Sequence, residues 1–159
     1  MSQIIYTMQF KGELSPVGTS PNVMKATMVA SCMCMTVVGP NGLQTPLEPA
    51  AGEQATFESD VTFLGGFESP EATVAGEAGF KETGMITFGG GEHRLRFSTI
   101  GQGYIGPSAE SNLRQGAVIW QVESGEGQFK GAQGLITSNF ILGEAGKITD
   151  HQMGVIFVT

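Results

Sequence analysis

The stretch Ser124–Phe140, SGEGQFKGAQGLITSNF, carries four glycines in its first eleven residues and then runs into an apolar segment. Glycine adopts positive φ and leaves room for a neighbouring backbone, which suits a tight turn followed by a sharply bent strand. Phe129 and Ala132 stand between these glycines, and we expect them to plug one end of a barrel. The stretch therefore predicts a corner of a closed β-sheet.

The rest of the chain alternates short apolar segments with clusters of Gly, Pro, Asn and Ser, which predicts an all-β protein. The 159 residues suit one domain, 1–159, and the 24 glycines are about twice the usual share. Nine strands with such turns fit a closed antiparallel barrel or a sandwich. The expected strands are Ile4–Lys11, Met24–Val38, Ala55–Leu64, Ala72–Phe80, Met85–Phe88, His93–Ile100, Ala117–Glu123, Gly134–Leu142 and Lys147–Val158.

The charge of the chain excludes two classes of partner. The net charge is −7 and the eight basic residues are scattered, whereas nucleic acids and anionic membranes are bound through clustered Lys and Arg. The sequence begins without the charged start and apolar core of a signal peptide, and no apolar run approaches about 18 residues. We therefore expect a soluble, cytoplasmic protein that binds neither nucleic acid nor membrane.

Residues Gly125–Gly134, GEGQFKGAQG, also resemble the carboxy-terminal signature of allene oxide cyclases, dirigent proteins and related small bacterial barrels. The resemblance covers Val122–Val158, about a quarter of the chain, and Ser124 stands where family members often have a paired glycine. It implies an eight-stranded calycin-like barrel with an apolar cavity, often a dimer or trimer. It also implies catalysis without metal or nucleotide, in which a dry pocket steers the ring closure of a reactive intermediate.

The segment AVIWQVE, Ala117–Glu123, places Gln121 and Glu123 on one face and Trp120 on the other, and one of the two faces must line the interior. We expect Gln121, Glu123 and Asn139 to be the polar groups of an otherwise apolar barrel. A desolvated Glu123 would have a raised pKa and act as an acid or base. Trp120 is expected to contact the ligand.

Two further residues are catalytic candidates. Tyr104 lies in GQGYIG, Gly101–Gly106, which matches a dinucleotide-binding spacing but is followed by Pro107 instead of a helix, so a strand end and a turn are expected. A tyrosine in that turn, at the barrel mouth, either donates to a ligand oxygen or packs on the rim. His93 shares a face with Phe97 and is either an inward proton carrier or a solvated turn residue.

Cys32 and Cys34 would lie about 6–7 Å apart on one face of a strand, which disfavours a disulfide between them. Their small and apolar neighbours indicate reduced thiols that fill the core, and with Trp120 they are candidates for the ligand chamber. The two cysteines and two histidines have no metal-ligand spacing, so no metal site is expected.

Three functions fit these patterns. The first is a cofactor-free cyclase or isomerase that acts on a small, apolar, oxygen-bearing substrate inside the barrel. The second is a non-catalytic carrier of a small hydrophobic molecule. The third is a structural, oligomeric barrel: both faces of the last strand are apolar, which indicates contact between subunits of a homo-oligomer, a dimer or trimer.

Overall fold

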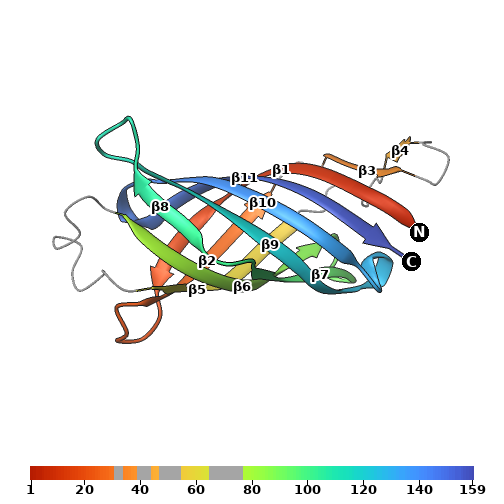
Figure 1. Cartoon of the computed structure of the whole chain (residues 1–159), viewed down its shortest axis with the longest axis horizontal. Coiled ribbons are helices and arrows are strands. Elements are labelled where there is room, and N and C mark those ends of the chain that lie inside the picture. Colours follow the sequence, from red (N-terminus) through yellow and green to blue (C-terminus); the bar gives the residue numbers. More distant parts are fainter. Residues whose placement is uncertain (31–33, 39–43, 47–54, 65–76) are drawn as a thin grey trace.

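The computed structural model describes residues 1–30, 34–38, 44–46, 55–64 and 77–159, and almost all of its regular structure is β-strand (Figure 1). The strands follow the alternating apolar pattern, and each of the short 3₁₀ turns η1 and η2 contains a glycine with positive φ. In chain order the elements are β1 (Ser2–Pro16), β2 (Val23–Ala30), β3 (Cys34–Val38), β4 (Gln44–Pro46), β5 (Ala55–Phe63), β6 (Ala78–Phe88), β7 (His93–Thr99), β8 (Gly103–Pro107), β9 (Arg114–Glu126), η1 (Gly127–Phe129), β10 (Gln133–Leu142), η2 (Glu144–Gly146) and β11 (Lys147–Val158).

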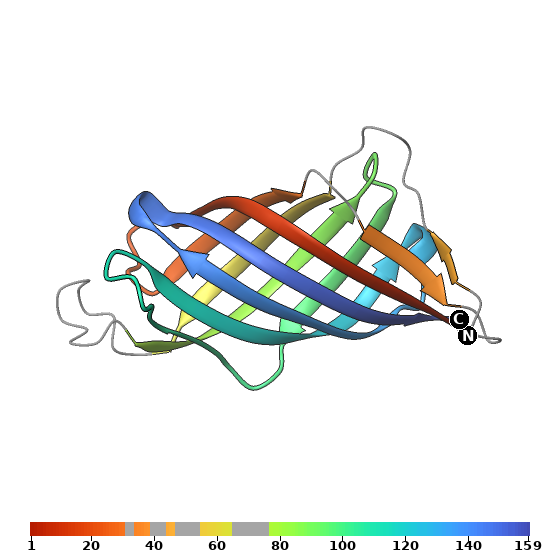
Figure 2. The ribbon, with the colours of Figure 1, turned by 90° about the horizontal axis from the view of Figure 1, so that it is seen from above.

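The first and last strands join and close the sheet into a barrel. β1 and β11 run antiparallel, from Ser2 opposite Val158 to Glu13 opposite Lys147. Around the barrel the order is β11, β10, β9, β7, β6, β5, β2 and β1, and β8 shares the place of β7 between β6 and β9. The strands cross the barrel obliquely and both chain ends lie at the same end of it (Figure 2). The predicted closed antiparallel barrel is confirmed, and the sandwich is excluded.

Side chains alternate between the interior and the outer surface, as period two requires. In β5 every second residue from Ala55 is buried, and Glu58 and Asp60 point outward because the phenylalanines at alternate positions take the interior. Phe57 lies at the centre of the core, with its ring 5.3 Å from that of Phe97 and 5.5 Å from that of Trp120. Each such aromatic pair adds about 0.5–1.5 kcal/mol beyond the burial of its area.

The glycine-rich stretch forms the predicted corner. Gly127 has a φ of 66° and begins η1, and Gly134 has a φ of 151°. A Cβ on Gly134 would lie 2.2 Å from the carbonyl oxygen of Val155, so the neighbouring strand approaches too closely for any side chain. Phe129 and Ala132 are buried and plug this end, as predicted.

Two strand predictions were wrong. The prediction ended one strand at Phe80 and began the next at Met85, but β6 continues through Lys81–Gly84. Gly84 is not a turn residue: a Cβ there would lie 2.7 Å from Cζ of Phe97, so the glycine makes room for a core ring. The predicted turn around Tyr104 is the separate strand β8. The parts of the predicted strands at 31–33 and 72–76 lie outside the described residues.

Candidate functional site

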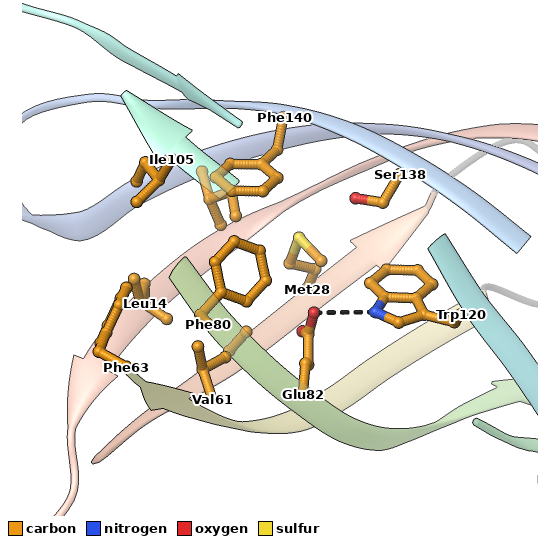
Figure 3. A pocket seen from close by; sticks show the side chains of 12 residues that line it. Leu14, Met28, Val61, Phe63, Phe80, Glu82, Ile105, Trp120, Ser138 and Phe140 are labelled. Atoms are coloured by element: carbon orange, nitrogen blue, oxygen red, sulfur yellow. Dashed lines mark hydrogen bonds between the residues drawn. The ribbon is translucent and has the colours of Figure 1, made fainter. Parts of the chain in front are cut away.

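A cavity lies inside the barrel, toward the end where β1 turns into β2 and β10 turns into β11 (Figure 3). Its volume is about 30 Å³, which is room for one or two water molecules. Leu14 and Phe140 line it and are partly exposed, so the cavity borders the surface. Apart from Glu82 and Ser138 the lining is apolar: Leu14, Ala26, Met28, Val61, Phe63, Phe80, Ile105, Trp120, Phe140 and Ile148.

Glu82 is the carboxylic acid in the cavity wall. The alternation of β6 turns its side chain inward with those of Phe80 and Ile86, and only 6% of the residue is exposed. Its Oε2 accepts a hydrogen bond of 3.1 Å from Nε1 of Trp120, and its Oε1 accepts one from the Ser59 hydroxyl. These two bonds fix the orientation of the carboxyl group against the cavity (Figure 3).

Burial raises the pKa of Glu82 to about 8, because the apolar surroundings disfavour the charged form. The negative charge of Asp150 raises this pKa as well, whereas the hydrogen bonds from Ser59 and Trp120 lower it. The carboxyl group is therefore mostly protonated at neutral pH. A protonated carboxyl group can donate a hydrogen bond or a proton to an oxygen in the cavity.

A second buried carboxyl group, that of Asp150 on β11, lies behind the cavity wall. Oδ1 of Asp150 accepts a 2.6 Å hydrogen bond from the hydroxyl of Ser138, and Oδ2 accepts one of 2.8 Å from Nε2 of Gln152. The Tyr6 hydroxyl in turn donates to Oε1 of Gln152 at 3.3 Å. Burial raises the pKa of Asp150 to about 6, although both hydrogen bonds lower it. Ser138 connects this cluster to the cavity that it lines.

Three of the expected interior residues face outward instead. Gln121, Glu123 and Asn139 are exposed, while Val118, Trp120 and Val122 are buried. The more apolar face of β9 turned inward because its burial gains more free energy. Glu123 also lies at a bulge, since Phe97 pairs with Val122 and Arg96 with Ser124, and its carboxylate accepts a hydrogen bond from Ser98 on the outer surface.

Trp120 is the candidate that the structure places at the cavity. Tyr104 faces outward from β8 with 50% of its surface exposed and does not line the cavity, whereas the next residue, Ile105, does. A hydrogen bond to the Glu77 carboxylate raises the pKa of the Tyr104 hydroxyl. Tyr104 and Asn139 border the same shallow groove of the outer surface.

Phe80, which lines the cavity, lies near the start of β6. His93 is half-buried at the start of β7, opposite Phe88 at the other end of β6, and does not line the cavity. The Nδ1 atom of His93 accepts a 3.1 Å hydrogen bond from the backbone N–H of Gln128, which holds the turn η1 in place.

Cys32 lies outside the described residues, and of Cys34 only the backbone, at the start of β3, is described.

Sequence reasoning missed both buried carboxyl groups. Glu82 lies in the gap between the predicted strands Ala72–Phe80 and Met85–Phe88. The alternation of Phe80, Glu82 and Ile86 with polar neighbours is the signal that places it inside. Asp150 shares the face of Ile148 and Ile156 in the same way. In both strands an acid at an apolar position was the available signal.

Comparison with protein families, with curated proteins and with solved structures found no match for this chain. Within the described ranges no three His, Cys, Asp or Glu residues converge to hold a metal ion. The described part of the chain contains no helix with the length and apolar character needed to span a membrane.

Proposed function

We propose that this barrel is a cofactor-free isomerase or cyclase that holds a small, mostly apolar, oxygen-bearing molecule against Glu82. The observation that carries the proposal is an acid with a pKa near 8 in the wall of an apolar cavity. Such a group keeps its proton at neutral pH and can give it to a developing oxyanion. This role replaces the one first expected for Glu123, and the resemblance of residues 122–158 to allene oxide cyclases points to the same class of reaction.

The cavity volume of about 30 Å³ takes only the oxygen-bearing group of such a molecule. The apolar body then extends toward the surface between Leu14 and Phe140, which are both partly exposed. Ser138 provides a second polar contact, because its proton is bound to Asp150 and its oxygen lone pairs can accept a hydrogen bond.

The chemistry is an isomerisation, so no atoms enter or leave the substrate. Glu82 donates its proton to the oxygen of an epoxide as its C–O bond breaks, or to a carbonyl oxygen as the π electrons shift to it. The same substrate returns one proton to the Glu82 carboxylate, from carbon or from the new hydroxyl group, as the product forms, so its composition and charge are unchanged. Trp120 and Ser59 bind the resulting carboxylate, and so reduce the cost of its brief ionisation in the apolar barrel.

The second candidate function is a non-catalytic carrier, since the same apolar lining suits a bound ligand without any reaction. If the protein is a carrier, native mass spectrometry of the freshly purified protein should detect a small molecule that co-purifies with it. Turnover separates the two functions. We propose to incubate the protein with a panel of unsaturated epoxides and enones and to follow the isomeric products by chiral chromatography.

Glu82→Gln is the decisive variant, because glutamine has nearly the shape of the acid but no proton to transfer at neutral pH. We expect it to lower kcat about 100-fold or more, the usual effect of losing a general acid. Glu123→Gln removes an exposed carboxylate at the bulge and is the matched control, expected to keep full activity. Equal activity of Glu82→Gln and the unmodified protein would contradict the proposal.

A further inference from the structure

The hydroxyl group of Ser138 faces the cavity as an acceptor of hydrogen bonds. It donates its own hydrogen to Oδ1 of Asp150 at 2.6 Å, while Oδ2 of Asp150 accepts a bond from Gln152. At pH 7 Asp150, with a pKa of about 6, is mostly ionised, and a carboxylate can only accept. Turning the Ser138 hydrogen toward the cavity would leave this buried charge short of a donor, so Ser138 offers the cavity only oxygen lone pairs.

Glu82 offers the cavity the opposite character. Hydrogen bonds from Trp120 and Ser59 use one lone pair on each of its two carboxyl oxygens. With a pKa of about 8, Glu82 also keeps its proton at pH 7. Because Trp120 and Ser59 both act as donors to Glu82, neither of them accepts this proton. The carboxyl proton is therefore available to a group in the cavity.

The cavity thus presents one donor and one acceptor in a wall that is otherwise apolar. Figure 3 shows the side chains of Glu82 on β6 and Ser138 on β10 reaching into the barrel from different strands. Trp120 also lines the cavity, but its N–H is bound to Glu82. The volume of about 30 Å³ admits about two non-hydrogen atoms of a ligand, so an oxygen placed there lies near both Glu82 and Ser138.

We propose that this cavity selects a hydroxyl group, and that the molecule bound by the barrel is an apolar alcohol held between Glu82 and Ser138. A hydroxyl oxygen accepts one hydrogen bond, here from Glu82, and donates another, here to Ser138. A carbonyl, ether or epoxide oxygen only accepts. A ligand without an O–H group would leave the lone pairs of Ser138 unpaired in apolar surroundings, and sites built for a hydroxyl group reject such analogues.

The alcohol also has a place in the proposed isomerisation, and this step rests on that proposed function. When an epoxide opens, its C–O bond breaks and its oxygen receives the proton of Glu82. The new hydroxyl group then turns to donate to Ser138, which leaves the Glu82 carboxylate open to take a proton from the carbon next to the reacting centre. The electrons of that C–H bond form a C=C bond. The product is the allylic alcohol isomer of the epoxide, and Glu82 is protonated again.

Isothermal titration calorimetry at pH 7 with 2-octanol and 2-octanone tests the selection of a hydroxyl group. The two compounds have the same carbon skeleton and differ only in the hydrogen atoms at the oxygen-bearing carbon and on the oxygen. Differences in size therefore nearly cancel. We expect the unmodified protein to bind the alcohol at least about 10-fold more tightly than the ketone, because only the alcohol pairs with Ser138.

Ser138→Ala removes the acceptor and should lower the ratio of the two affinities to about 1. Ser138→Cys is the second variant, because its thiol can still donate to Asp150 and so protects the fold. Sulfur is a weak acceptor, so the ratio should fall here as well. The ratio compares two ligands in the same protein, and a general loss of affinity or stability therefore cancels.

Ser98→Ala is the matched control. Ser98 also donates a hydrogen bond to a carboxylate, that of Glu123, but on the outer surface of the barrel. Its substitution should keep the full preference for the alcohol. Equal affinity of the unmodified protein for the two compounds overturns the proposal. Binding of neither at millimolar concentration does so too, as does a preference that both Ser138 variants retain.

The proposed reaction fails or stands separately from the selection of a hydroxyl group. If the alcohol is preferred but no epoxide is turned over, the hydroxyl site stands and only the isomerase function is overturned. If Glu82→Gln abolishes turnover while the alcohol and the ketone bind equally well to the unmodified protein, the isomerase function stands and the hydroxyl site is overturned.

Discussion

The indole Nε1 of Trp120 donates a 3.1 Å hydrogen bond to the carboxyl oxygen Oε2 of Glu82 inside the barrel. The two residues come from different strands, β9 and β6, and both line the cavity. Trp120 is the single tryptophan of the chain, so its fluorescence reports on its surroundings without interference from a second indole. This pairing makes the ionisation of the candidate acid directly measurable.

We predict that the emission of Trp120 changes with pH around a midpoint near 8, the pKa of Glu82. The cause is the negative charge that appears beside the indole when the carboxyl group loses its proton. A fluorescence titration from pH 5 to 10 measures the midpoint. In Glu82→Gln the transition should be absent, and in Glu123→Gln it should be unchanged.

Asp150→Asn should move this midpoint to lower pH. The charge of Asp150 raises the pKa of Glu82, so removing that charge makes the Glu82 carboxylate easier to form. Asparagine keeps an acceptor for the Ser138 hydroxyl, and the variant is expected to lose about 1–3 kcal/mol of stability from its altered bond with Gln152. An unchanged midpoint would show that the two carboxyl groups do not interact.

The free energy of unfolding should fall as the pH rises from about 4.5 to about 8. In this range folded Glu82, with its pKa near 8, keeps a proton that the unfolded chain has already lost, so higher pH favours unfolding. Each such group contributes a slope of up to about 1.4 kcal/mol per pH unit. Asp150, with a pKa near 6, adds to the slope only in the lower part of the range.

Urea unfolding at a series of pH values measures this slope. Between pH 6 and 8 the slope should be much smaller in Glu82→Gln, which has no proton to lose there. Stability that increases with pH over this interval would contradict the burial of a protonated Glu82.

Gly154→Ala is predicted to destabilise the barrel by about 1–3 kcal/mol, the usual cost of overpacking a core. Gly154 faces the interior, and a Cβ on it would lie 2.1 Å from Cε1 of the buried Tyr6 ring. Tyr6 would have to move, and its hydrogen bond to Gln152 would be strained. Thermal unfolding measures the loss.

Gly143→Ala is the control for this substitution. A Cβ there meets Cδ2 of Leu113 at 3.5 Å, an ordinary contact, and the φ of −104° suits alanine. Its cost should be below about 0.5 kcal/mol. Equal losses for the two glycines would mean that crowding against Tyr6 is not the cause.

The barrel corner shows what local sequence can predict. Glycines at Gly127 and Gly134 supply backbone angles that other residues rarely adopt, and the apolar Phe129 between them has to be buried. Both requirements depend only on neighbouring residues. The outward direction of Glu58 and Asp60 was predictable for the same reason, since the phenylalanines beside them take the interior.

The candidate site could not be predicted in this way. Period two separates the residues of β9 into two faces, but which face encloses the interior depends on what the other strands bring to it. Trp120 faces inward because Phe57 and Phe97 pack against it, and neither is near it in sequence.

The sequence by itself determined an all-β chain, its sharp corners and, for most strands, which side chains share a face. These features follow from the backbone angles and hydrophobicity of adjacent residues. Only the tertiary structure decided that Glu82 and Trp120 meet in the cavity and that Asp150 lies close enough to affect the pKa of Glu82. These relationships arise when β1 pairs with β11, since closure brings distant strands together and defines an inside.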